Sequence, residues 1–155
     1  SEAFCQSLTQ TTIPDQHRSW LTPAVVSQGH THMSHLHSLN WNQHHTCSPF
    51  FSIHKQSADI LSLCERPFSE GLPNKSPLHL IFYDAFSPRK QPELWSSDVF
   101  EWLYQALSPA GTLVTYCAQS QVKRTLRAVG FDVEALAGPP GKREMTRAFK
   151  AYYVT

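Results

Sequence analysis

The most informative segment of the sequence is Leu78-His79-Leu80-Ile81-Phe82-Tyr83, a nearly unbroken apolar run that ends at Asp84. Such a run predicts a strand that is buried on both faces, as in a parallel sheet. Ligands of open α/β sheets bind beyond the carboxyl ends of the parallel strands. We therefore expect Asp84 and the loop after it to lie at the ligand edge of a sheet.

The chain after this strand alternates between helical and extended patterns. Helices are expected over residues 98–107, capped by Ser96 or Ser97, and over 121–129, ended by Gly130. Three more strands are expected, at residues 112–118, 131–136 and 148–154. The last two strands are close in sequence and predict an antiparallel hairpin. This alternation is typical of an α/β fold with a doubly wound sheet.

The first 49 residues have a different character from the rest of the chain. They are polar, weakly periodic and interrupted by prolines, so we expect turns and one short helix near residues 20–26. A helix is also expected over residues 1–8. A strand is expected at residues 50–55, followed by a turn at 58–61. With 155 residues in all, the length suits a single domain.

Composition excludes several classes of protein. The chain is 41% hydrophobic and 16% charged, which is enough apolar content for a core. No run approaches the roughly 18 apolar residues that span a bilayer, and the first residues do not resemble a secretion signal. The four cysteines are scattered and form no C-x-x-C motif. We therefore expect a cytoplasmic protein with reduced thiols and no membrane partner.

Asp84 is the strongest candidate for chemistry. A carboxylate at the ligand edge can accept hydrogen bonds from an amine, hold a cation or act as a base. The alternative is local, with Asp84 accepting N–H bonds from its own turn. The segment from Cys117 to Ser120 follows the next strand and is expected at the same edge.

Two other groupings have less specific interpretations. Six histidines crowd one segment, at positions 30, 32, 35, 37, 44 and 45, but without a zinc-binding spacing, so we expect a solvated polar loop and no metal site. Seven of the 13 Lys and Arg residues lie between Lys123 and Lys150. They could form a basic face for a phosphate backbone or an ordinary solvated surface. No glycine-rich phosphate loop is present.

Three stretches together resemble the MnmC-like methyltransferase domain. Residues 84–95 read D-x-F-x-P-x-K-x-P-E-x-W, residues 107–118 carry the next apolar strand, and residues 122–145 end in G-K-R-E-M. The resemblance covers about residues 50–150, which would form the family-like core behind a variable segment at 1–49. It implies an enzyme of Rossmann-like, S-adenosylmethionine-dependent methyltransferase fold. Family members methylate the aminomethyl group of the wobble uridine in certain tRNAs.

The resemblance also implies roles for individual residues. Asp84 matches the acidic residue that faces the substrate amine, and Phe86 and Pro88 would shape the slot around the base. Asp59 matches a position that contacts the adenine amino group of the cofactor. Lys142 and Arg143 match a basic loop that meets tRNA phosphate. No metal is implied, because the sulfonium is already activated.

One family feature is missing from this sequence. The family carries a glycine-rich F-G-T-G-type turn after its first strand and an acid at the end of its second, and neither is found here. The chain is therefore expected to correspond to the C-terminal two thirds or so of such a domain, N-terminally truncated. In the sheet order 3-2-1-4-5-7-6, this would leave the strand at residue 50 without a neighbour and the edge of the strand at residue 78 exposed.

Two further interpretations stay open at this point. The chain could belong to a methyltransferase acting on a different amine, or it could be a degenerate, non-catalytic relative. Two-domain members of the family add a flavin oxidase domain, and nothing in this sequence resembles one.

Overall fold

The computed structural model describes residues 23–67, 76–138, 141 and 143–152. The helix predicted over residues 1–8 and the basic residue Lys142 lie outside this part of the chain. The chain divides into two compact units, Ser1–Ser57 and Ala58–Thr155. The strand predicted at residue 50 belongs to the first unit. Among the described residues, no helix is both long and apolar enough to cross a membrane.

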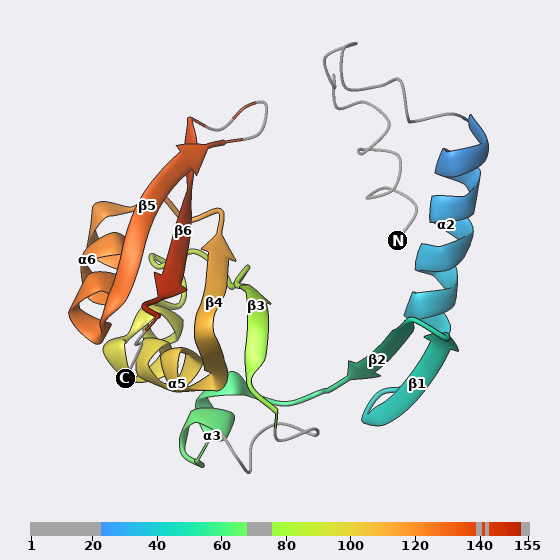
Figure 1. The fold of residues 1–155 in the computed structure, drawn as a ribbon, viewed down its shortest axis with the longest axis horizontal. Coiled ribbons are helices and arrows are strands. Elements are labelled where there is room, and N and C mark those ends of the chain that lie inside the picture. Colours follow the sequence, from blue (N-terminus) through green and yellow to red (C-terminus); the bar gives the residue numbers. More distant parts are fainter. Residues whose placement is uncertain (1–22, 68–75, 139–140, 142, 153–155) are drawn as a thin grey trace. The chain divides into compact units, whose positions relative to one another are not determined.

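In residues 23–57, the described part of the first unit, a helix is followed by a two-stranded hairpin (Figure 1). Its elements are α2 (Pro23–Ser38), β1 (Gln43–Ser48) and β2 (Phe51–Lys55). Strands β1 and β2 are antiparallel, so the expectation that the strand near residue 50 has no neighbour is wrong. A helix is present where a short one was expected near residues 20–26, but it extends to Ser38. The expected loop is wrong, because histidines 30 to 37 lie in α2 and histidines 44 and 45 in β1.

Lys55 joins the hairpin to the end of α2. Its Nζ donates to the carbonyl oxygens of Leu36, His37 and Leu39, at 3.2, 3.0 and 2.7 Å. It also lies 4.6 Å from the ring centroid of Trp41. A cation at a helix C-terminus satisfies carbonyls that lack partners and opposes the negative end of the helix dipole. These partners are 16 to 19 residues apart in the sequence, so local periodicity does not show that the helix extends to Ser38.

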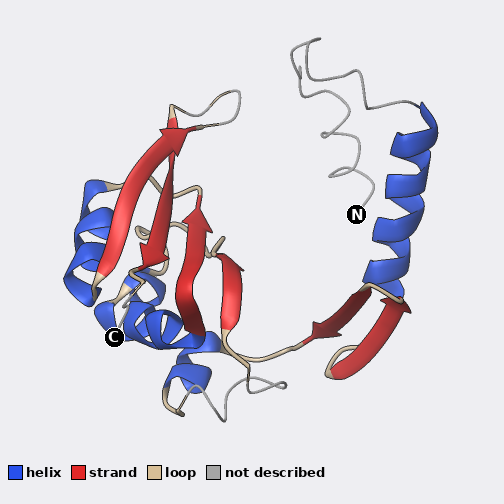
Figure 2. Cartoon of the chain, in the orientation of Figure 1, coloured by secondary structure: helices blue, strands red, loops and turns tan. Residues whose placement is uncertain are grey.

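The second unit is a four-stranded mixed sheet with helices on one face (Figures 1 and 2). Its helical elements are α3 (Ile60–Cys64), the 3-10 helix η2 (Pro92–Trp95), α5 (Ser97–Ala106) and α6 (Ser120–Val129). Its strands are β3 (Leu78–Phe82), β4 (Leu107–Thr115), β5 (Phe131–Ala137) and β6 (Glu144–Lys150). The order is β3-β4-β6-β5, with β3 parallel to β4 and β6 antiparallel to both its neighbours. This order matches the 4-5-7-6 half of the expected sheet.

The predicted helix signals are confirmed in α5 and α6. The Ser96 hydroxyl accepts the N–H of Val99 at 3.4 Å and caps α5. Gly130 ends α6 in the left-handed conformation, with φ of 115°, which a glycine adopts without steric cost. The apolar faces of these helices pack on the sheet and form the core, with Val99, Phe100, Leu103, Val122 and Leu126 buried against Leu113, Phe131 and Ala148.

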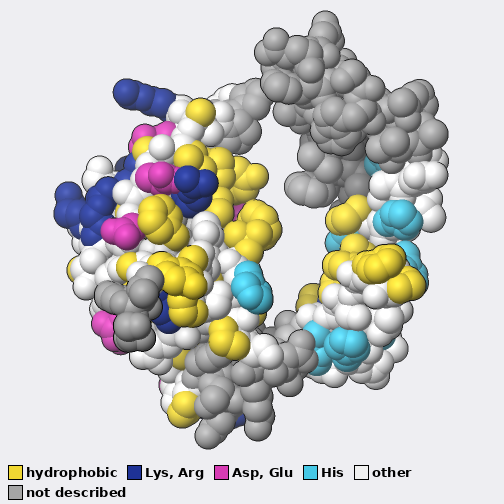
Figure 3. Space-filling view, in the orientation of Figure 1, with side chains coloured by type: hydrophobic (Ala, Val, Ile, Leu, Met, Phe, Trp, Pro, Cys, Tyr) yellow, Lys and Arg dark blue, Asp and Glu magenta, His cyan; other side chains and the backbone are white. Residues whose placement is uncertain are grey.

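Strand β3 is not buried on both faces as predicted. Leu80 is 49% exposed and Phe82 is 77% exposed, whereas Ile81 packs against the core. The reason is that β3 is the edge strand of the described sheet and that α5 and α6 lie on the opposite face. Figure 3 shows hydrophobic side chains gathered over the sheet, beside acidic and basic ones. The predicted exposed edge at residue 78 is therefore present in the described part of the chain.

Three elements of the second unit differ from the prediction. The strand expected at residues 112–118 is β4, which runs from Leu107 to Thr115. The segment expected as a turn at residues 58–61 begins the short helix α3, because the Asp59 side chain caps it. The last strand begins at Glu144 instead of residue 148. Its early residues are polar, and the strand is held there by pairing with β4 and β5, which the hydrophobic pattern does not show.

Truncation of Leu126 to alanine should lower the free energy of unfolding by about 2–5 kcal/mol, because the side chain is fully buried and leaves a cavity. The matched change Leu80→Ala should lower it by no more than about 1 kcal/mol, because Leu80 is half exposed. Denaturant unfolding of both variants measures the difference. Equal losses would contradict the assignment of α6 to the core and Leu80 to the open face.

Candidate functional site

A pocket of about 290 Å³ lies where β3 and β4 end. Two loops line it, one after each strand, and Trp95 lies between them. The lining residues are Asp84, Ala85, Ser87 and Pro88 from the first loop and residues 115–119 from the second. The predicted placement of Asp84 and of the segment starting at Cys117 at one edge of the sheet is thus confirmed.

Trp95 and Tyr83 hold the segment after β3 through hydrogen bonds to its backbone carbonyls. The indole Nε1 of Trp95 donates to the carbonyl of Phe86 at 2.7 Å, and the Tyr83 hydroxyl donates to the carbonyl of Leu94 at 2.5 Å. The rings of Tyr83 and Trp95 meet edge to face, with centroids 5.2 Å apart. Burial, and secondarily the Cys64 thiol, raises the pKa of Tyr83 to about 12. The phenol therefore remains a hydrogen-bond donor at neutral pH.

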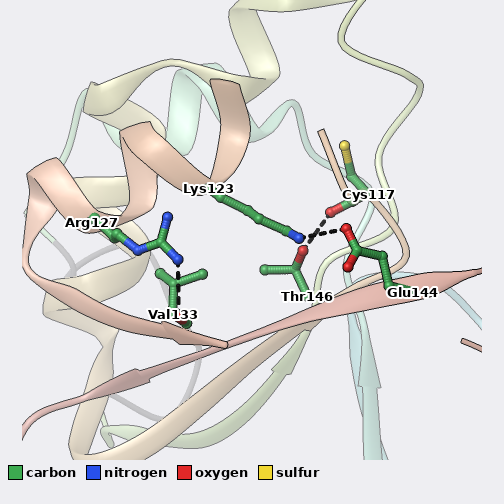
Figure 4. A network of polar contacts seen from close by, with 6 residues as sticks. All are labelled: Cys117, Lys123, Arg127, Val133, Glu144 and Thr146. Atoms are coloured by element: carbon green, nitrogen blue, oxygen red, sulfur yellow. Dashed lines mark hydrogen bonds and ion pairs between the residues drawn. The ribbon is translucent and has the colours of Figure 1, made fainter. Parts of the chain in front are cut away.

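The loop after β4 is held by two threonines. The hydroxyl of Thr115 accepts the N–H of Cys117 at 3.1 Å, and the hydroxyl of Thr146 donates to the carbonyl of Cys117 at 2.8 Å. Figure 4 shows Thr146 reaching Cys117 beside the ion pair between Lys123 and Glu144, whose Nζ–Oε1 distance is 2.7 Å. Both walls of the pocket are thus fixed by hydrogen bonds to backbone carbonyls.

Asp84 differs from these supporting residues. It is exposed, it lines the pocket, and within the described residues its carboxylate makes no hydrogen bond or ion pair. The alternative in which Asp84 caps its own turn is therefore not observed. Its oxygens are available to a ligand, and an amine is the natural partner for such a carboxylate.

The other predicted site residues differ in whether they line the pocket. Pro88 lines the pocket, whereas the Phe86 side chain is 71% exposed and only its backbone carbonyl is engaged, by Trp95. The Asp59 carboxylate accepts the N–H of Leu61 at 3.1 Å as the cap of α3. Arg143 is exposed at the base of the loop before β6, and Lys142 lies outside the described residues.

Several of the clustered Lys and Arg side chains are engaged within the fold. Lys123 is paired with Glu144, and Arg147 forms an ion pair with Glu134 across the β5–β6 hairpin. Lys150 donates to the carbonyls of Tyr104 and Leu107 at the end of α5, at 3.0 and 2.9 Å. Several of these cations therefore stabilise the fold, because each satisfies a local anion or carbonyl.

No metal centre is visible in the part of the chain that the structure describes. In residues 23–67, 76–138, 141 and 143–152, no group of three or more His, Cys, Asp or Glu side chains is placed to hold an ion.

Some supporting residues carried no signal in the sequence. Trp95 belongs to the D-x-F-x-P-x-K-x-P-E-x-W string, but its donor role depends on the fold. Thr146 lies 29 residues from Cys117 and reaches it through the pairing of β6 with β4. An isolated Thr in a strand gives no indication of such a contact.

Comparison with known proteins identifies relatives of this unit. A family described as S-adenosyl-L-methionine-dependent methyltransferase matches residues 52–151. The chain is 34% identical over 85 residues to the tRNA 5-methylaminomethyl-2-thiouridine biosynthesis bifunctional protein MnmC of Nitrosospira multiformis, a match that covers 55% of this chain and 14% of that protein. The protein of the same name in Idiomarina loihiensis is 35% identical over 98 residues, covering 60% and 16%.

A solved structure shares the fold. The crystal structure of MNMC2 from Aquifex aeolicus superposes with a TM-score of 0.61 at 24% identity, over 81% of this chain and 38% of that one. The aligned part of the chain spans about a seventh of the length of the curated relatives, at 14% and 16%.

The Lys123–Glu144 pair should contribute stability that depends on pH. The hydrogen bond from Lys123, then its charge, holds the pKa of Glu144 below its usual value. The contribution is therefore fully present above the pKa of Glu144 in the unfolded chain and is lost as pH falls through its lower value in the folded chain. Glu144→Gln should destabilise the protein at neutral pH, and the difference from wild type should vanish in acid.

Unfolding free energies measured from pH 7 down to pH 3 test this expectation. Glu101→Gln, on the exposed face of α5, is the matched control and should show little difference at any pH. A Glu144→Gln deficit that stays constant into acid would show that the ion pair is not its source.

Proposed function

The chain belongs to the family of S-adenosyl-L-methionine-dependent methyltransferases, and we propose that it acts in methyl transfer from S-adenosylmethionine to the aminomethyl group of the wobble uridine of tRNA. The observation that carries the proposal is Asp84, an uncommitted carboxylate on the wall of a pocket at the carboxyl ends of parallel strands. It lies in the stretch that the family matches. The relatives named for biosynthesis of 5-methylaminomethyl-2-thiouridine in tRNA support the choice of substrate.

The residues of this chain fit one side of such a site. Asp84 and Pro88 would face the reacting amine, and Asp59 would offer its second carboxylate oxygen to the adenine amino group, because the first accepts the N–H of Leu61. No glycine-rich turn for the methionine end of the cofactor occurs in the sequence. When bound, S-adenosylmethionine supplies a methyl group activated by its positive sulfur.

The reaction needs a neutral amine held in line with that methyl group. The Asp84 carboxylate would accept an N–H bond from the amine and so orient the nitrogen lone pair. As the nitrogen gains its new bond to carbon, positive charge develops on it, and the adjacent carboxylate stabilises that charge. The proton released from nitrogen would pass to Asp84 or, through it, to water.

The rest of the substrate would meet the rims of the pocket. The exposed ring of Phe86, together with Pro88, offers apolar surface to a base. Arg143 and Lys142 would meet phosphate of the tRNA backbone at the loop before β6. We propose that the reaction takes place in the cytoplasm.

Calorimetric titration of the chain with S-adenosylmethionine, followed by methyl transfer to tRNA that carries the aminomethyl group, tests the proposal. Saturable binding with transfer would support it. Transfer to small amines but not to tRNA would favour another amine substrate. A folded chain that binds neither cofactor nor tRNA would favour a non-catalytic relative.

Asp84→Asn should reduce methyl transfer about 10²–10⁴-fold, the usual contribution of a positioned general base. The shape of the side chain is kept, and because Asp84 is exposed and unpaired, stability should change little. Asp132→Asn, on the exposed start of β5 at the opposite edge of the sheet, is the control and should retain full activity. Equal activity of the two variants would exclude Asp84 from the reaction.

A further inference from the structure

In the described part of the second unit, the buried polar side chains are Thr115 and Thr146. Both are hydrogen-bonded to the backbone of Cys117. Thr115 is 3% exposed and Thr146 is fully buried. Thr115 accepts the N–H of Cys117, and Thr146 donates to its carbonyl. The two hydrogen bonds fix the peptide planes on either side of the Cys117 α-carbon.

Each of these buried hydroxyls has a hydrogen-bond partner in the backbone of Cys117. Burying a hydroxyl is unfavourable unless it is hydrogen-bonded, and a valine of nearly the same shape would fill either position without a polar group. The hydroxyls hold the segment that forms one wall of the pocket, since residues 115–119 line the same pocket as Asp84.

Strand β6, which carries Thr146, also holds the helix that follows this wall. Helix α6 begins at Ser120, directly after the wall, and its Lys123 is paired with Glu144. Glu144 and Thr146 are two residues apart on β6, so their side chains lie on the same face of the sheet (Figure 4). The start of β6 thus supports residues 116–119 at both ends.

We propose that Thr146, together with Thr115, is a positioning residue of the candidate site. It sets the backbone of residues 116–119 so that this wall faces the amine held by Asp84. The inference rests on the proposed function for the identity of the ligand, but the rigidity of the wall can be measured without any ligand. Neither threonine touches the reacting atoms in this proposal.

Two pairs of variants test it. Thr146→Val and Thr115→Val remove the hydroxyl and keep the shape, whereas Thr146→Ser and Thr115→Ser keep the hydroxyl. Amide hydrogen exchange is read at residues 117–119, with Leu126 in the core of α6 as an internal reference. We expect the valine variants to speed exchange at the wall about tenfold, the effect of one ordinary hydrogen bond, and the serine variants to restore protection. Leu126 should be unchanged.

The kinetics of methyl transfer are the second measurement on the same variants. The valine variants should lower kcat while the KM for S-adenosylmethionine stays near wild type, and the serine variants should recover most of kcat. A merely structural threonine would reduce the amount of folded protein and leave the kinetics of the remainder unchanged.

The outcomes separate this inference from the proposed function. Faster exchange at Leu126 as well as at the wall, or no change at the wall, would overturn the positioning role. Local loosening with unchanged kcat would overturn it too. A wild-type chain that transfers no methyl group would count against the proposed function for this chain, and the exchange pattern would still decide whether the threonines set the wall.

Discussion

The parallel pairing of β3 with β4 is the constraint on which the site depends. Leu80 pairs with Thr112 and Phe82 with Val114, and the N–H of Tyr83 continues the ladder to the carbonyl of Val114 at 2.8 Å. Parallel strands end at the same edge, so the chain leaves β3 at Asp84 and β4 at Thr115 within reach of one pocket. An antiparallel pair would have placed these two loops at opposite ends of the sheet.

The walls of that pocket are held by the same kind of hydrogen bond. In three places a donor from the core or its margin binds a carbonyl of a connecting segment: Trp95 binds Phe86, Tyr83 binds Leu94, and Thr146 binds Cys117. If water replaced the buried donor at a loop carbonyl, that donor would be left without a hydrogen-bond partner. The loops are thus held as firmly as the strands they follow, while the Asp84 carboxylate between them is left without a partner in the described chain.

The sequence predicted what depends on local pattern and missed what depends on distant contacts. Helices α5 and α6 were found because Ser96 and Gly130 mark their ends and their apolar faces have helical spacing. Asp84 was placed correctly because it directly follows an apolar strand. Helix α2 was expected only near residues 20–26, and its extension to Ser38 was missed because its polar end is stabilised by the distant Lys55. The start of β6 was missed for the same kind of reason, since Thr146 is buried through a bond to Cys117.

The exposed face of β3 is distinct from the pocket that Asp84 lines. Phe82 is 77% exposed at the edge of the described sheet, and the pocket lies on the side of β3 that faces β4. In the proposed reaction, the amine would therefore be contacted by the segments of this chain that follow β3 and β4. Leu80 and Phe82 do not line the pocket, so the exposed edge of β3 and the wall that carries Asp84 are separate surfaces.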